Sequence, residues 1–224
     1  MKSVTDQVYE NIKNLIYLGK IQPGERIDYN LLQTEFNVSI IPIREATKLL
    51  VAERLLELKP RKGTYVRNLK TEEIDEIYYL RGILEANALK EAIKNINNKD
   101  IIKLKEIANK IKIAKKDRDS SLLFSQNKDF HLFVYSLANK PFLLKLIQQL
   151  WAWTAPYRTF YHLASRDKRE DIDIELHQKI IEACEKKDAE LGIRAMLDHF
   201  ERARKEIKSI AEKINQERGN YKNE

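Results

Sequence analysis

One change in the spacing of apolar residues constrains the fold of this 224-residue chain more than any other feature. Apolar side chains recur at intervals of three and four along most of the sequence, which is typical of amphipathic helices. Residues 55–66 depart from this spacing, because two short runs rich in β-forming residues flank the basic turn 59–63. Two such runs around a glycine-containing turn predict a β-hairpin. The chain is therefore expected to be mainly α-helical, with one small hairpin.

Three short helices are predicted ahead of the hairpin. The first extends from about Ser3 to Leu18 and ends at Gly19, a residue that favours helix termination. Asp28 is suited to cap the second helix. Ser39 is suited to cap the third, and Pro42 falls in its first turn, where a missing N–H costs little. Three helices followed by a basic hairpin is the order of a winged helix-turn-helix.

Beyond residue 70 the sequence predicts only helices. The chain has 6 glycines and 5 prolines, too few for a protein built of many short strands. The predicted helices span about 72–95, 99–116, 120–138, 141–162, 173–186 and 188–216. They indicate an all-α bundle of six helices, or of seven if one of them is broken.

The expected domain organisation has four parts. Apolar residues make up 43% of the chain, enough for two hydrophobic cores. The parts are a winged helix-turn-helix over 1–67, a linker over 68–72, an all-helical domain over 73–216 and a polar tail over 217–224.

Composition indicates the class of partner and the compartment. The formal net charge of +7 favours nucleic acid or another anionic surface as partner. Cys184 is the single cysteine, so no disulfide can form within the chain, which suits a reducing cytoplasm. No signal peptide and no apolar run long enough to span a membrane is present, so a cytoplasmic location without membrane contact is expected.

The predicted third helix and the hairpin tip carry the candidate DNA-contacting residues. A recognition helix places its N-terminal residues against base edges in the major groove. Ser39 and the adjacent backbone N–H groups suit a phosphate, while Arg44 can reach a guanine edge or a phosphate. The alternative for each charged residue is an ordinary solvated side chain. The candidates are Ser39, Ile40, Pro42, Arg44, Lys48, Arg61, Lys62 and Gly63.

The N-terminal 66 residues resemble the GntR family of bacterial regulators. The matching stretches are 19–26 (Gly-Lys-Ile-Gln-Pro-Gly-Glu-Arg), Val38-Ser39, 42–46 (Pro-Ile-Arg-Glu-Ala), Leu49-Leu50 and 60–66 (Pro-Arg-Lys-Gly-Thr-Tyr-Val). The resemblance implies a homodimer that binds double-stranded DNA at a palindromic operator. It also places Ser39, Arg44 and Gly63 at DNA-contacting positions.

Two departures from the family pattern bear on DNA binding. Ile40 and Ile41 stand where the family usually has Arg and Thr, so a cation that usually contacts DNA is missing. Ile40 can instead contact a thymine methyl group. Arg54 stands where a glycine usually precedes the wing.

The four histidines all lie in the predicted helical domain: His131, His162, His177 and His199. Asn127 and His131 are four residues apart on one predicted helix and therefore share a face. Histidines from three helices of a bundle can converge on one metal, although spacing alone leaves hydrogen-bonded core or surface histidines as the alternative. His162 is expected to be such an ordinary residue.

Residues 73–212 resemble the FCD ligand-binding domain of the FadR subgroup. The matching stretches are 80–85, 127–131, 138–141, 175–177 and 196–199. In many members an Asp and three His at these places hold a divalent metal, so the resemblance implies a metal site, with Zn or Ni expected. Here the ligands are Asn127, His131, His177 and His199. Asn replaces the usual Asp, which predicts weaker binding because the carboxylate charge is lost.

The resemblance also places Arg81 and Arg158 at the effector cavity. A planar guanidinium binds a carboxylate through two hydrogen bonds, so a small organic acid is the expected effector. The alternative for both is a surface or interhelical salt bridge. The aromatic residues Trp151, Trp153, Tyr157 and Tyr161 are expected in core packing or at a dimer face.

Three functions are compatible with these features. The favoured hypothesis is a transcription repressor whose operator binding is modulated by a small carboxylate in a metal-containing pocket. A second is a regulator for which the metal itself is the signal. A third is a metal-dependent hydrolase with Glu85 or Glu175 as general base, which the attached DNA-binding module disfavours.

Overall fold

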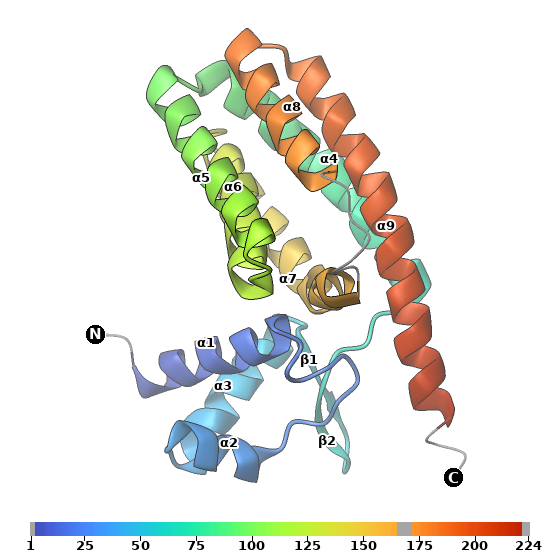
Figure 1. Ribbon diagram of the computed structural model, residues 1–224. Coiled ribbons are helices and arrows are strands. Elements are labelled where there is room, and N and C mark those ends of the chain that lie inside the picture. The colour runs from blue at the N-terminus through green and yellow to red at the C-terminus, as the bar shows by residue number, and fades with distance from the viewer. Residues whose placement is uncertain (1–2, 165–171, 221–224) are drawn as a thin grey trace.

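The computed structural model describes the backbone of residues 3–164 and 172–220. The side chains of residues 120, 159–164, 172–173 and 217–220 lie outside this description. Figure 1 shows the winged helix-turn-helix at one end of the molecule and a bundle of longer helices at the other. The predicted fold class, mainly α-helical with one β-hairpin, is confirmed.

The winged helix-turn-helix consists of α1 (Val4–Tyr17), α2 (Tyr29–Phe36), α3 (Ile40–Ala52), β1 (Leu56–Lys59) and β2 (Gly63–Val66). Asp28 caps α2 as predicted, since its carboxylate accepts from the N–H groups of Asn30 and Leu31. Ser39 occupies the N-cap position of α3, but its side chain forms no capping hydrogen bond. The Ser39 hydroxyl therefore stays available at the N-terminus of this helix.

Helices α1 and α3 end in the same motif with different residues. After α1, the N–H of Gly19 donates to the Ile16 carbonyl, and the N–H of Lys20 to that of Leu15. This is a Schellman motif, and Gly19 adopts the positive φ of 70° that it requires. After α3, Arg54 takes the equivalent position with φ 59° and Leu55 closes the motif on Leu50. An arginine therefore holds a left-handed conformation that glycine adopts at lower cost.

The wing is a two-stranded antiparallel hairpin in which Leu56 pairs with Val66 and Lys59 with Gly63. Its turn is closed by a 3.0 Å hydrogen bond from the Lys62 N–H to the Lys59 carbonyl. Gly63 has φ 108°, and a Cβ atom there would lie 2.9 Å from Nε of Arg26. Both the backbone conformation and the neighbouring guanidinium therefore require glycine at this position.

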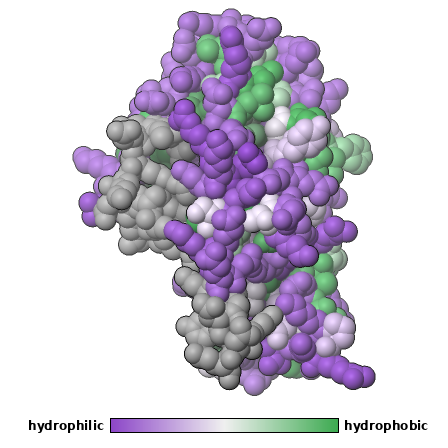
Figure 2. Space-filling view, turned by 90° about the vertical axis from the view of Figure 1, so that its right-hand side faces the viewer, coloured by the Kyte–Doolittle hydropathy of each residue, from purple (hydrophilic) through white to green (hydrophobic). Residues whose placement is uncertain are grey.

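The helical domain contains six helices within the described residues. They are α4 (Thr71–Asn95), α5 (Asn98–Lys116), α6 (Ser120–Ser136), α7 (Pro141–Ala164), α8 (Ile172–Lys186) and α9 (Ala189–Asn220). No helix in the described part is long and apolar enough to cross a membrane. Figure 2 shows that hydrophilic side chains cover most of the α9 side, with hydrophobic residues in smaller areas between them.

Two boundaries differ from the sequence prediction. Helix α4 begins at Thr71, so the extended connection ends two residues earlier than the predicted linker 68–72. Helix α9 continues to Asn220, four residues into the predicted polar tail 217–224. Polar residues such as Glu and Arg have high helix propensity, so a polar composition did not mark the end of this helix. Asn215 of α9 also accepts a hydrogen bond from Asn68.

The two domains share part of a hydrophobic core. Phe124 of α6 and Ala155 of α7 are buried among the core residues of the winged helix-turn-helix. The Trp153 indole N–H donates to the Glu53 carbonyl at 2.7 Å, at the end of α3. In the linker, the Leu69 N–H donates to the Tyr157 hydroxyl at 2.6 Å. Helix α7 thus holds both the DNA-binding domain and the linker.

We predict that Arg54→Gly stabilises the protein by about 0.5–1 kcal/mol, because it removes the Cβ strain of a left-handed residue. The measurement is the free energy of unfolding from urea denaturation. Arg54→Ala is the matched control, since it also removes the charge but keeps Cβ. An equal gain from both variants would show that charge, rather than backbone conformation, is responsible.

Candidate functional site

Helix α3 presents an exposed face next to its N-terminus. Its opposite face is buried and carries Ile43, Ala46, Thr47 and Leu50. Ser39, Arg44 and Lys48 are all exposed, and Ile40 and Pro42 are half-buried. Lys48 forms an exposed ion pair with Glu45 at 2.8 Å. Such a pair contributes little to stability, so the Lys48 ammonium group can exchange it for a phosphate at small cost.

The wing tip carries the second group of predicted contacts. Arg61 and Lys62 are exposed, and Gly63 is half-buried beside Arg26. Arg61 has φ 60° within the hydrogen-bonded turn 59–62. The tip therefore projects two cations from a tightly turned backbone, a shape suited to the edge of a groove in duplex DNA.

Two residues absent from the predicted site belong to this surface by position. Ile41 is 69% exposed and is three residues from Arg44, whereas Ile40 is half-buried. The helical period would have identified Ile41 as the outward residue of the pair. Arg26 reaches the wing through a bridge between its backbone and that of Tyr65. Nothing in the local sequence marks this long-range contact.

In the helical domain, Arg81 is enclosed within the bundle with 1% of its surface exposed. Its Nε donates to Oε1 of Glu85 at 2.7 Å, one turn further along α4. Its guanidinium carbon lies 4.8 Å from the ring centroids of Tyr78 and Phe200. The predicted alternative of a surface salt bridge is wrong for Arg81, because the ion pair that it forms is fully buried.

Arg158 lies in the same cluster. Its guanidinium carbon is 4.3 Å from the Trp151 ring centroid, and that of Arg81 is 4.7 Å from the same centroid. The Trp151 indole N–H donates to Oε1 of Glu85 at 3.0 Å. The resemblance placed Arg81 and Arg158 at one cavity. In the structure, both guanidinium groups contact the ring of Trp151.

Several polar atoms in this cluster lack a hydrogen-bond partner among the described residues. They are Nη1 of Arg81, Oε2 of Glu85 and the hydroxyl of Tyr78. Buried polar atoms are nearly always hydrogen-bonded, so each such atom calls for a ligand or a water. Together they offer donors and an acceptor to a polar molecule.

The structure brings two of the four predicted metal ligands together. His131 and His177 are buried, and their Nε2 atoms are 3.3 Å apart. Nδ1 of His131 lies 3.4 Å from the Tyr135 hydroxyl, which itself donates to Sδ of Met196. Burial lowers the pKa of His131 well below its usual value, with His177, His199 and both arginines adding to the effect.

The other two predicted ligands lie on the same helix as His131 and on α9. Asn127 is buried one helical turn before His131, and His199 is half-buried beside Phe200. No group of three His, Cys, Asp or Glu side chains suited to a metal ion occurs among the described residues. Two imidazoles with Nε2 atoms this close fit a divalent metal in their chemistry. The side chains of Tyr161 and His162 lie outside the described residues.

Two family models cover most of the chain. The bacterial regulatory protein model of the gntR family matches residues 4–66. The FCD domain model matches residues 76–202. The two matches coincide with the winged helix-turn-helix and with the bundle from α4 to α9.

Curated relatives match over nearly their whole length. The HTH-type transcriptional regulator McbR of Escherichia coli is 29% identical over 188 residues, which are 84% of this chain and 85% of the relative. The gluconate operon transcriptional repressor of Bacillus subtilis is 27% identical over 212 residues, 91% of this chain and 85% of that protein.

A solved structure supports the same assignment. The structure of E. coli McbR/YncC superposes with a TM-score of 0.83 at 27% identity, covering 92% of this chain and 98% of that one. These families consist of transcription regulators, so the hydrolase hypothesis is wrong. The chain belongs to the GntR family, in the FadR subgroup with an FCD domain, and is a DNA-binding transcriptional regulator.

Proposed function

We propose that this regulator is a repressor whose operator affinity is controlled by a small hydroxy acid bound between Arg81 and Arg158. The observation that carries the proposal is the buried guanidinium of Arg81, whose Nη1 has no hydrogen-bond partner among the described residues. A guanidinium in a dry environment binds a carboxylate strongly and with defined geometry.

The chemistry of the pocket favours a hydroxy acid over a simple fatty acid. Oε2 of Glu85 accepts a hydrogen bond, and the Tyr78 hydroxyl donates or accepts one. A ligand with a carboxylate and hydroxyl groups would satisfy these atoms together with Arg81. Two similar proteins are gluconate operon repressors by name, and gluconate is a carboxylate with several hydroxyl groups.

The DNA-contacting surface is proposed to consist of the N-terminal half of α3 and the wing tip. The exposed residues Ser39, Arg44 and Lys48 would face the major groove, with Ile40 and Pro42 beside them and the half-buried Gly63 at the wing. Arg61 and Lys62 would contact the adjacent backbone or minor groove. Ile41, exposed between Ser39 and Arg44, would add an apolar contact to a thymine methyl group.

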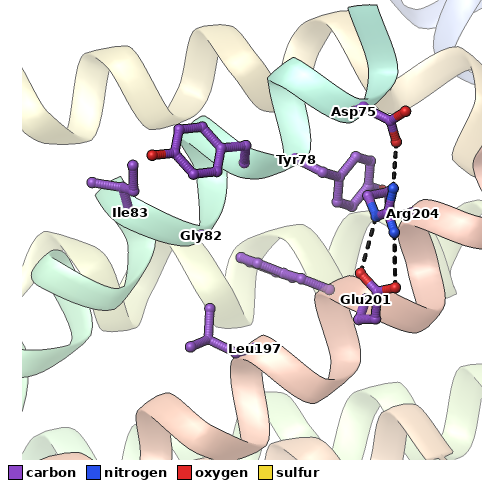
Figure 3. Close-up of a pocket in the computed structure, with 9 residues that line it drawn as sticks. Asp75, Tyr78, Gly82, Ile83, Leu197, Glu201 and Arg204 are labelled. Carbon is purple, nitrogen blue, oxygen red and sulfur yellow. Dashed lines mark hydrogen bonds and ion pairs between the residues drawn. The ribbon is translucent and has the colours of Figure 1, made fainter. Parts of the chain in front are cut away.

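A homodimer is proposed to form on the face shared by α4 and α9. A groove of about 570 Å³ lies there, and Figure 3 shows Tyr78, Gly82 and Ile83 of α4 opposite Leu197 of α9. Exposed apolar residues continue over this face: Tyr79, Leu80, Ile83 and Leu197. A contiguous apolar patch of this kind marks an interface, and a twofold dimer would place the same patch on both chains.

A divalent metal, Zn or Ni, is proposed at the His131–His177 pair. The two imidazoles, whose Nε2 atoms are 3.3 Å apart, would supply two ligands, and Asn127 and His199 would add an oxygen and a nitrogen. The metal would supply positive charge that attracts an acidic effector. Because Asn127 is neutral, we expect affinity below that of a site with a carboxylate.

Substitution of Arg44 by Ala is expected to weaken operator binding by about 1–3 kcal/mol and to lower the salt dependence by roughly one ion. The operator is first selected from random duplex DNA by the wild-type protein, and affinity is then measured at several salt concentrations. Lys110→Ala, an exposed change on α5, should leave both quantities unchanged.

Sedimentation of the complex should give two chains per duplex, and one chain per duplex would contradict the proposed dimer.

Gluconate is the probe for the effector pocket. In the wild type we expect saturable binding by calorimetry and a change in operator affinity. Arg81→Lys keeps the charge beside Glu85 but loses Nη1, so binding should weaken by about 1.5–3 kcal/mol, the worth of a hydrogen bond to a charged group. Arg202→Lys, an exposed change on α9, is the control. Equal gluconate binding by Arg81→Lys and the wild type would refute the assigned pocket.

The metal proposal is tested with Asn127→Asp, which restores a carboxylate beside the histidine pair. We expect Zn²⁺ or Ni²⁺ affinity to rise about tenfold, equivalent to 1.4 kcal/mol, and His131→Ala to lose the ion. Metal content is measured by mass spectrometry after dialysis, with the exposed Asn98→Asp at the start of α5 as control. If the His131→Ala variant kept the metal content of the wild type, this site would be excluded. Operator affinity that follows the metal without gluconate would identify the metal as the signal.

A further inference from the structure

A cavity lies between the two domains, apart from the cluster around Arg81 and Arg158. Its volume is about 290 Å³, and residues of α1, α6 and α7 line it. Helix α1 belongs to the winged helix-turn-helix, while α6 and α7 belong to the bundle. A molecule in this cavity would therefore touch both domains at once.

The walls of this interdomain cavity are aromatic. Tyr17 of α1 and Phe124 of α6 face each other across the domain boundary, with ring centroids 6.1 Å apart and planes tilted by 57°. Trp151 of α7 supplies a third aromatic wall. Aromatic rings favour tilted or offset contacts with another ring, so these walls suit a flat aromatic ligand.

The charges at the cavity favour an anion. Lys128 of α6 lies over the Tyr17 ring at 5.9 Å, and no described carboxylate forms an ion pair with it. Lys13 also lines the cavity and is partly neutralised by Glu53 at 3.4 Å. Glu10 is the acidic residue of the lining, and it is exposed. Lys128 is therefore the group best placed to bind an acid.

We infer that the interdomain cavity binds a compact aromatic carboxylate, with the ring against the side chains of Tyr17, Phe124 and Trp151 and the acid group on Lys128. This would be a second ligand site, distinct from the proposed hydroxy acid site although both use Trp151. Trp151 separates the two, because its ring also contacts the guanidiniums of Arg81 and Arg158.

Occupancy of this site would reach DNA through α1. The buried residues Val8, Ile12 and Ile16 of α1 share one core with Ile43 and Leu50 of α3. A ligand that moves α1 relative to α7 therefore also moves the recognition helix. A ligand that binds one arrangement of α1 and α7 more tightly than another would therefore change operator affinity when the cavity fills.

Benzoate is the test probe, used with the full-length protein in calorimetric titrations. We expect saturable binding, no comparable binding of the neutral benzyl alcohol, and benzoate affinity about tenfold lower in Lys128→Gln, a loss of 1.4 kcal/mol. Lys110→Gln is the charge-matched control on α5. Ala152→Met places a larger side chain in the cavity lining and should abolish benzoate binding while operator binding persists.

Two outcomes would overturn the inference. One is absence of saturable benzoate binding in the wild type. The other is a loss of benzoate binding in Arg81→Lys but not in Lys128→Gln, which would place benzoate in the hydroxy acid pocket instead. Failure of gluconate to bind would leave the benzoate result unchanged, so the two sites are tested separately.

Discussion

The buried ion pair between Arg81 and Glu85 is the interaction around which the helical domain is organised. Charges enclosed in a protein interior must be paired and hydrogen-bonded, and removal of one partner typically costs about 3–5 kcal/mol. Here α4 supplies both charges one turn apart, Trp151 of α7 donates to the carboxylate, and Phe200 of α9 packs on the guanidinium. Three helices thus meet at one ion pair. Replacing a buried ion pair by apolar residues is often neutral or stabilising, so stability alone does not account for this one.

Helix α7 connects this cluster to the DNA-binding domain. Trp151 and Arg158 lie in the cluster, while Trp153 and Tyr157, between them on the same helix, bond the end of α3 and the linker. Because Phe124 and Ala155 are buried in the core of the winged helix-turn-helix, the two domains cannot move independently without exposing apolar surface. A rearrangement around Arg81 and Arg158 would therefore be transmitted through α7 to the recognition helix.

Most of the fold could be predicted from local patterns. Helical spacing and capping residues such as Asp28 located the helices to within a few residues, because these signals act over a single turn. The misplaced end of α9 has the opposite cause. Polar residues allow either helix or coil, so the local pattern does not mark where this helix ends.

By itself the sequence determined the order of the elements and the placement of cations at the start of the third helix and at the tip of the wing. Only the tertiary structure decided which histidines meet, that Trp151 lies against two arginines, and that a cavity opens between the domains. These features depend on packing between helices far apart in the chain. No periodic pattern records such packing, because periodicity describes which face of a helix is buried and not which helix covers it.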